Sequence, residues 1–155
     1  MTTEYLLMLI ARWLHIVAAA LAVGVPLYVR FVELPAIGTL PEAERSRFRE
    51  AIAKRWRIIV YTAILVFLAT GFYTFLGVRR WQDFSSEVKA RYHLYFGMKL
   101  ILALGAFFIS SALAGRSAKL APMREKAGFW LSVLILLVLL IVVLSGTMRF
   151  MPPAA

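Results

Sequence analysis

Four long apolar windows restrict this chain to an α-helical membrane fold. They cover approximately residues 6–29, 58–78, 92–114 and 129–150, and 62% of the 155 residues are hydrophobic. A helix needs about 20 mainly apolar residues to cross the hydrocarbon core of a bilayer, and each window supplies them. Too few residues remain between the windows for a separate soluble domain. The sequence therefore predicts an all-α fold, a single polytopic four-helix membrane bundle over residues 1–155.

The basic residues are distributed unevenly among the three connections between these windows. The first and third connections carry most of them: Arg30, Arg45, Arg47, Arg49, Lys54, Arg55, Arg57, Arg116, Lys119, Arg124 and Lys126. These two connections lie on one side of a four-helix protein, and positive charge favours the cytoplasmic side. We therefore expect both termini outside, in a bacterial cytoplasmic (inner) membrane. The net charge of +10 then reflects topology and contact with membrane lipid rather than nucleic-acid binding.

Turn-forming and capping residues mark the ends of the predicted helices. The segment 31–39 contains proline and glycine and predicts a break after the first span. Pro41 opens the run PEAERSRFREAIAKRWR, which we expect to form an amphipathic cytoplasmic helix leading into the second span. Ser85 or Ser86 is expected to cap the helix that becomes the third span. The absence of cysteine excludes disulfides and thiolate-ligated metal sites.

Polar side chains inside the windows gather in one layer of the bilayer. With both termini outside, the outer half contains Arg12, His15, Thr70, Tyr73, Thr74, His93, Lys99, Thr147 and Arg149. The inner halves consist almost entirely of Ala, Leu, Val, Ile and Phe. Ionisable groups at membrane depth are costly and usually face the bundle interior, where they have a partner. Their convergence from four helices predicts a site near the outer surface.

Both histidines stand on helix faces made of small residues. The neighbours of His15 at helical spacing include Ala11, Ala18, Ala19 and Ala22, and His93 shares a face with Gly97, Ile101, Gly105 and Ala112. Such faces let helices approach closely, and they also leave a slot for a flat ligand. Imidazole is a common axial ligand of haem iron. We therefore interpret His15 and His93 as ligands of a haem b, and Arg12, Lys99 or Arg149 as partners of its propionates.

Alternatives remain for each of these residues. His15 also suits a hydrogen bond within the bundle or a proton relay, and His93 suits contact with lipid headgroups. Lys99 also suits snorkelling of its long side chain toward the outer surface. Met98, Met148 and Met151 are soft donors that suit Cu(I), although isolated methionines at helix ends more often serve packing. Copper is therefore the alternative metal, bound by His15 and His93 with these methionines.

Several short motifs resemble the CopD-like and HemJ-like four-helix membrane proteins. They are W-L-H followed by alanines, glycine and P-L-Y (13–28), a basic and aromatic start to a helix ending in T-G-x-Y (55–73), and Y-F-G-M-K-L-I-L-A-L (95–104). The resemblance implies His15 as a haem ligand, Lys99 as a functional lysine, and Arg55 or Arg57 as the match of a basic position at the start of the family's second helix. It leaves the second axial ligand open.

The expected function follows from the layer of histidines and from this resemblance. We expect a haem b membrane protein, cytochrome b-like, that transfers electrons with a quinone or another redox partner. The resemblance implies two alternatives, a copper-handling protein of CopD type and a protoporphyrinogen oxidase of HemJ type. Enzymatic activity as a membrane oxidoreductase is left open. The small-residue faces would also allow two copies to pair as a homodimer.

Overall fold

The computed structural model describes residues 3–76 and 85–149, and its described part contains helices and no strand. The four long helices are α1 (Thr3–Tyr28), α3 (Glu42–Leu76), α4 (Ser86–Ala114) and α6 (Ala127–Arg149). Each belongs to a helical stretch long and apolar enough to cross a membrane. An all-α, four-helix membrane protein is therefore what the structure supports.

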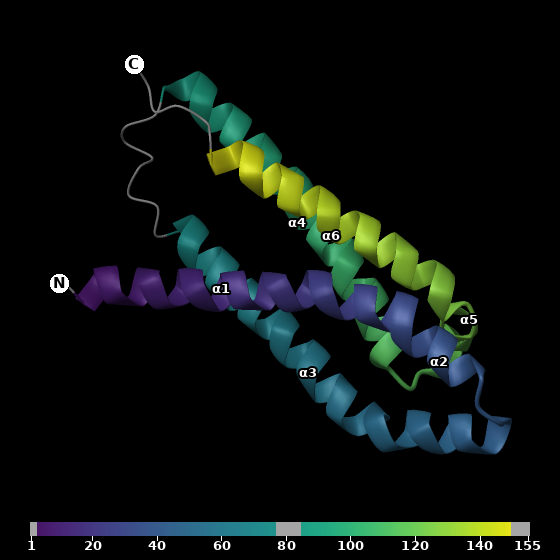
Figure 1. Ribbon diagram of the computed structural model, residues 1–155. Coiled ribbons are helices and arrows are strands. Elements are labelled where there is room, and N and C mark those ends of the chain that lie inside the picture. Colours follow the sequence, from purple (N-terminus) through teal and green to yellow (C-terminus); the bar gives the residue numbers. More distant parts are fainter. Residues whose placement is uncertain (1–2, 77–84, 150–155) are drawn as a thin grey trace.

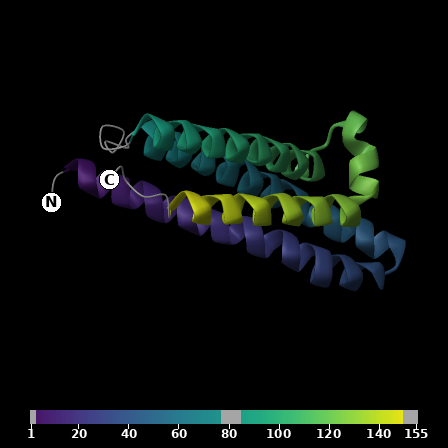
Figure 2. The same cartoon turned by 90° about the horizontal axis from the view of Figure 1, so that it is seen from above.

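The four long helices alternate in direction around a ring. Helix α1 packs against α3 and α6, and α4 packs against the same two helices. Figures 1 and 2 show α4 and α6 side by side along their length, with both ends of the chain at one end of the bundle. We call this the terminal end, where α1 and α4 begin and α3 and α6 finish. The opposite end, residues 29–57 and 115–127, is called the basic end.

The break predicted at residues 31–39 is wrong, because the first helix continues through most of this segment. Helix α1 passes into a π-turn, Val29–Glu33, and then into α2 (Leu34–Gly38). Pro26 lies inside α1 and removes one backbone hydrogen bond, and a π-turn is one way to readjust the ladder after such a loss. Pro35 lies in the first turn of α2, where proline is tolerated. The chain turns only at residues 39–41.

Helix α3 begins at Glu42 and confirms the helix expected after Pro41. Its 35 residues extend about 52 Å, well beyond the roughly 30 Å hydrocarbon core. The charged first part therefore projects past the apolar part at the basic end. Arg45 anchors its start, because Nη2 donates to the carbonyl oxygens of Gly38 at 3.0 Å and Leu40 at 3.1 Å.

Helix α4 begins after a serine that the sequence marked as a cap, and it ends at Ala114, where the third apolar window ends. Ser85 is the N-cap and its hydroxyl accepts a hydrogen bond from the backbone N–H of Val88 at 3.3 Å, which confirms one of the two predicted caps. Gly115 is the C-cap. The connection to α6 contains a 3-10 turn, Ala118–Leu120, and the short helix α5 (Ala121–Glu125). Arg124 donates from Nη1 to the carbonyl of Ala112 at 3.4 Å and from Nη2 to that of Ser117 at 2.8 Å, and so holds this connection to the end of α4.

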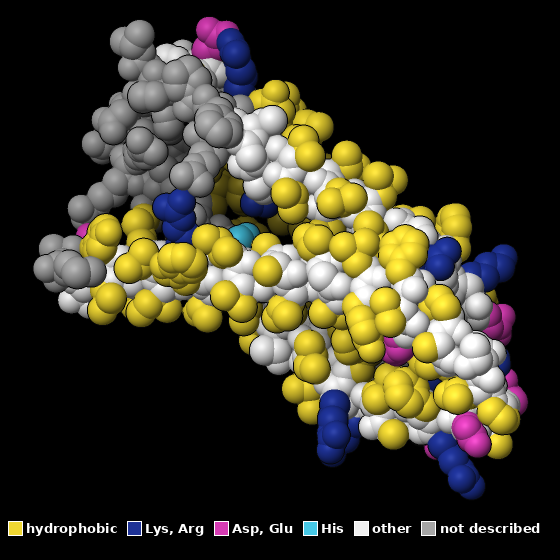
Figure 3. Space-filling model, viewed as in Figure 1, with side chains coloured by type: hydrophobic (Ala, Val, Ile, Leu, Met, Phe, Trp, Pro, Cys, Tyr) yellow, Lys and Arg dark blue, Asp and Glu magenta, His cyan; other side chains and the backbone are white. Residues whose placement is uncertain are grey.

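Few side chains are buried, and most large apolar ones face outward. The buried cluster lies between α4 and α6 and consists of Ala106, Ile109, Leu131, Leu134 and Val138. Figure 3 shows apolar side chains over most of the visible surface, with charged ones concentrated near the basic end. In a bilayer, lipid tails cover such a surface, and small residues between helices allow close packing. The distribution therefore fits a protein that spans a membrane.

Candidate functional site

His15 faces α3, so the imidazole of the first span points toward the rest of the bundle. The ring is half-buried, and its Nδ1 lies 2.8 Å from Oγ1 of Thr70. Thr70 is 7% exposed and is the one buried polar residue in the described part of the chain. An unpaired polar group is costly inside a membrane, so each of these two side chains supplies the other with a partner.

The hydrogen bonds of Thr70 determine which nitrogen of His15 carries the proton. The Thr70 hydroxyl donates to the carbonyl oxygen of Val66, one turn earlier on α3, at 2.5 Å. A hydroxyl has a single hydrogen, so toward His15 its oxygen acts as the acceptor. Nδ1 of His15 must then be the donor, and Nε2 carries the lone pair. This is the tautomer in which Nε2 of a histidine binds a metal while the other nitrogen is held by an acceptor.

Apolar and small residues surround the His15 ring. The ring of Phe67 lies edge-to-face at 5.1 Å between centroids, and Phe107 of α4 follows at 5.9 Å from Phe67. A β-carbon on Gly71 would lie 3.7 Å from Cε1 of His15, which is an ordinary contact distance. Glycine at this position leaves room for one methyl group between the α3 backbone and the imidazole edge that carries Cε1. Phe67 and Gly71 of α3 therefore both lie next to the ring.

An apolar groove lies next to the His15–Thr70 hydrogen bond. Its volume is about 290 Å³, and α1 and α3 form its walls. The lining residues are Leu7, Ile10, Ala11, Leu14, Ala69, Thr70 and Tyr73. Most of them are exposed, so in a bilayer the groove opens toward the lipid. It gives an apolar ligand a path to the neighbourhood of His15 from within the membrane.

The three cations predicted to pair with haem propionates lie in different surroundings, and one of them is close to His15. Lys99 of α4 is half-buried, and its positive charge acts on His15. Arg12 lies one turn before His15 on α1 and is exposed. Arg149 ends α6, and its side chain lies outside the described part of the structure. Lys99 is thus the predicted cation that the structure brings to His15.

The structure does not bring the two histidines together. His93 is exposed and lies edge-to-face with Phe75 at 5.8 Å, whereas His15 contacts Phe67, Thr70 and Gly71. Phe75 is eight residues beyond Phe67 on α3, which corresponds to about 12 Å along the helix. Two axial ligands of one iron must face each other across the ring. His15 and His93 therefore belong to different levels of the bundle.

The small-residue faces serve mainly as helix contacts. Ala11 and Ala18 beside His15 are buried, as expected for close packing of α1. On α4, Ala112 is 1% exposed and a β-carbon on Gly105 would meet Leu137 of α6 at 3.6 Å. Ile101, in the middle of the same predicted stripe, is 71% exposed. The stripe on α4 is thus no continuous inward face, and its deeper part packs against α6.

Two partners of His15 were not singled out from the sequence. Thr70 was recognised only as one polar residue of the outer layer, and Phe67 was not distinguished from other apolar residues of the second span. A threonine in an apolar window, next to glycine in A-T-G, was the available signal. In the described ranges, 3–76 and 85–149, no group of three or more His, Cys, Asp or Glu side chains is close enough to hold a metal ion.

Comparisons with protein-family models, with curated proteins and with solved structures give no match for this chain. The similarity to CopD-like and HemJ-like proteins therefore stays a prediction based on short motifs. The function has to be argued from the environment of His15.

Proposed function

We propose that this chain is a haem b-binding membrane protein that transfers electrons near the terminal end, with His15 as the residue that would hold the haem iron. The observation that carries the proposal is the chain of hydrogen bonds from His15 through Thr70 to the Val66 carbonyl. This chain of hydrogen bonds leaves Nε2 with the lone pair that an iron ligand requires. It also fixes the orientation of the imidazole ring, as a hydrogen-bond acceptor at the other ring nitrogen does for a metal-bound histidine. When bound, haem b supplies a centre that accepts and gives up one electron.

The residues around His15 fit a haem better than a metal ion that needs several protein ligands. A single axial histidine is sufficient for several classes of haem protein, whereas a copper site needs further donors. The neighbours of His15 in the described residues include Thr70, Phe67 and Gly71, and none of these three carries a second soft donor. Lys99 would pair with a propionate, which is an anion that needs a cation at this depth. His93 of α4 contacts Phe75, which lies about 12 Å along α3 from Phe67, and this is too far for it to share a ligand with His15 in this arrangement.

The orientation in the membrane belongs to the same proposal. The basic end contains most of the arginine and lysine residues of the connections, so we place it in the cytoplasm of a bacterium. His15 then lies in the outer half of the cytoplasmic membrane. The apolar groove between α1 and α3 would give a lipid-soluble redox partner access to that level.

An absorption spectrum and a metal analysis of the purified protein test the proposal. Protein from haem-sufficient cells, solubilised in detergent, should be red, with a Soret band, a reduced α band and iron rather than copper. His15→Ala should abolish the haem, and His93→Ala should retain it. A colourless wild type, or full haem retention in His15→Ala, would refute His15 ligation. Copper without a porphyrin spectrum would instead support a CopD-type role, and turnover of protoporphyrinogen IX would support a HemJ-type oxidase.

A further inference from the structure

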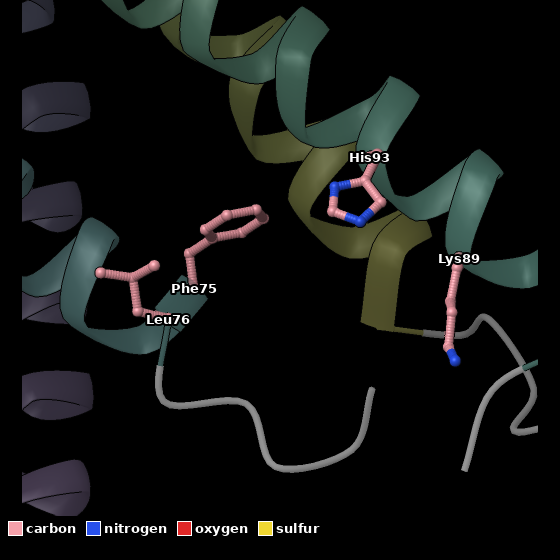
Figure 4. A pocket seen from close by; sticks show the side chains of 4 residues that line it. All are labelled: Phe75, Leu76, Lys89 and His93. Atoms are coloured by element: carbon pink, nitrogen blue, oxygen red, sulfur yellow. The ribbon is translucent and has the colours of Figure 1, made fainter. Parts of the chain in front are cut away.

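A second cavity lies at the terminal end, away from His15. Its volume is about 320 Å³, and it is lined by Phe75 and Leu76 at the end of α3 and by Lys89 and His93 near the start of α4. Figure 4 shows the Phe75 and His93 rings extending toward each other from the two helices. The cavity combines an aromatic wall with two side chains that can donate hydrogen bonds.

The aromatic wall is held in place by its neighbours. The ring of Phe75 stacks on Phe96 of α4 with a centroid distance of 3.9 Å and an interplanar angle of 17°. The His93 ring meets Phe75 nearly at a right angle, with an interplanar angle of 76°. Because stacked and edge-to-face contacts restrict ring rotation, the wall is preformed for a flat ligand. A planar ring that enters the cavity would extend this aromatic cluster.

Two donors lie on one face of α4 beside the wall. Lys89 and His93 are four residues apart, so they are neighbours on the helix surface. The nearby cation Arg91 is already paired with Glu87. Lys89 has no ion pair in the part of the chain that the structure describes. A lysine and a histidine one turn apart on α4 favour a ligand with oxygen acceptors.

The surroundings indicate that such a ligand comes from the membrane. Leu76 of the lining is 76% exposed, and Leu94, next to His93 on α4, is exposed as well. These apolar groups continue the lipid-facing surface up to the cavity. A ligand that reaches it therefore combines a planar ring, carbonyl or hydroxyl oxygens and solubility in lipid.

We propose that this cavity binds the headgroup of a quinone, with its ring against Phe75 and its oxygens accepting hydrogen bonds from Lys89 and His93. The site is separate from His15, so binding does not require haem. Only its role as a source or acceptor of electrons rests on the proposed function. The aromatic wall is what favours a quinone over a lipid phosphate, because a phosphate would use Lys89 and His93 but gain nothing from Phe75.

Direct binding of a short-chain ubiquinone analogue to the full-length protein tests this proposal. Equilibrium binding is measured in nanodiscs of zwitterionic lipid, for the wild type and four variants. Lys89→Met keeps the length of the side chain without its charge, and His93→Phe keeps a ring without its N–H. Each should weaken binding about tenfold, the usual effect of losing a hydrogen bond that involves a charged or strongly polar donor. Phe75→Leu should weaken it about threefold through lost ring contact.

The fourth variant and two further results separate the outcomes. Lys119→Met, which changes an exposed lysine at the basic end, should leave quinone affinity unchanged. His15→Ala should bind the quinone as the wild type does, so a colourless protein that still binds quinone refutes only the haem proposal. Wild-type affinity in both Lys89→Met and His93→Phe would overturn the quinone site. Quinone binding that Phe75→Leu leaves unchanged and that anionic lipid displaces would also overturn the quinone site. It would indicate a site for a lipid phosphate instead.

Discussion

Replacing Thr70 by valine tests the structural basis of the proposed haem site most directly. Valine has nearly the shape of threonine, so the change removes the hydroxyl that joins Nδ1 of His15, at 2.8 Å, to the Val66 carbonyl, at 2.5 Å. His15 then loses the acceptor that orients its ring and selects its tautomer. Losing such a partner of a metal ligand typically lowers metal affinity by about 10–100-fold. We expect a fall of this size in haem affinity.

The same substitution has a smaller expected effect on the stability of the protein without haem. Hydrogen bonds between membrane helices contribute about 0.6 kcal/mol on average and at most about 1.7 kcal/mol. The unfolding free energy of Thr70→Val should therefore fall by about 1 kcal/mol, too little to prevent folding. This modest loss separates a haem defect from general misfolding.

Thr74 provides a matched control one turn later on α3. Its hydroxyl donates to the carbonyl of Thr70 at 2.7 Å, the same kind of bond that Thr70 makes to Val66. Among the hydrogen bonds of the described residues, none joins Thr74 to His15. Thr74→Val thus removes an equivalent intrahelical hydrogen bond and leaves the histidine partner intact. Thr70→Ser retains the hydroxyl and should bind haem nearly as the wild type does.

Haem titration of the apoprotein, followed at the Soret band, compares these variants. Detergent-solubilised protein is used for each, with thermal unfolding of the apoprotein measured in parallel. Of these variants, we expect weak haem binding in Thr70→Val alone. Equal haem affinities in Thr70→Val and Thr74→Val would refute the claim that Thr70 orients an iron ligand.

Two further predictions concern glycines. Gly71→Ala should keep haem affinity within about threefold, since its new methyl lies 3.7 Å from Cε1 of His15, whereas Gly71→Leu should fill the space beside the ring and abolish binding in the same titration. Gly115→Ala should lower the unfolding free energy by about 1–3 kcal/mol, because its β-carbon would lie 2.8 Å from the Ser111 carbonyl. Gly146→Ala, with open space at its β-carbon, should instead raise stability by up to about 1 kcal/mol, and unchanged denaturation in both would contradict this reasoning.

Local composition was sufficient to predict the membrane helices. In a bilayer the backbone N–H and C=O groups of a spanning segment must pair within the protein. A long apolar window achieves this by forming a helix. The Ser85 cap was also predictable from local sequence, because a hydroxyl just before a helix accepts a hydrogen bond from a backbone N–H of the first turn. The break predicted at residues 31–39 is wrong for two reasons. Proline is tolerated in the first turn of α2, and the π-turn before it has already adjusted the backbone hydrogen bonds of the helix.

Contacts between helices depended on rotation and axial position, which composition leaves open. The sequence placed His15, Thr70 and His93 in one layer, but it did not specify which of them touch. Burial of Ala11 and Ala18 turns α1 so that His15 meets Thr70, 55 residues away in the chain. The axial position of α4 sets His93 against Phe75 instead. The two histidines contact α3 eight residues apart, about 12 Å along the helix, which makes them two distinct sites instead of a shared pair. Only side-chain packing between the helices decides this axial position.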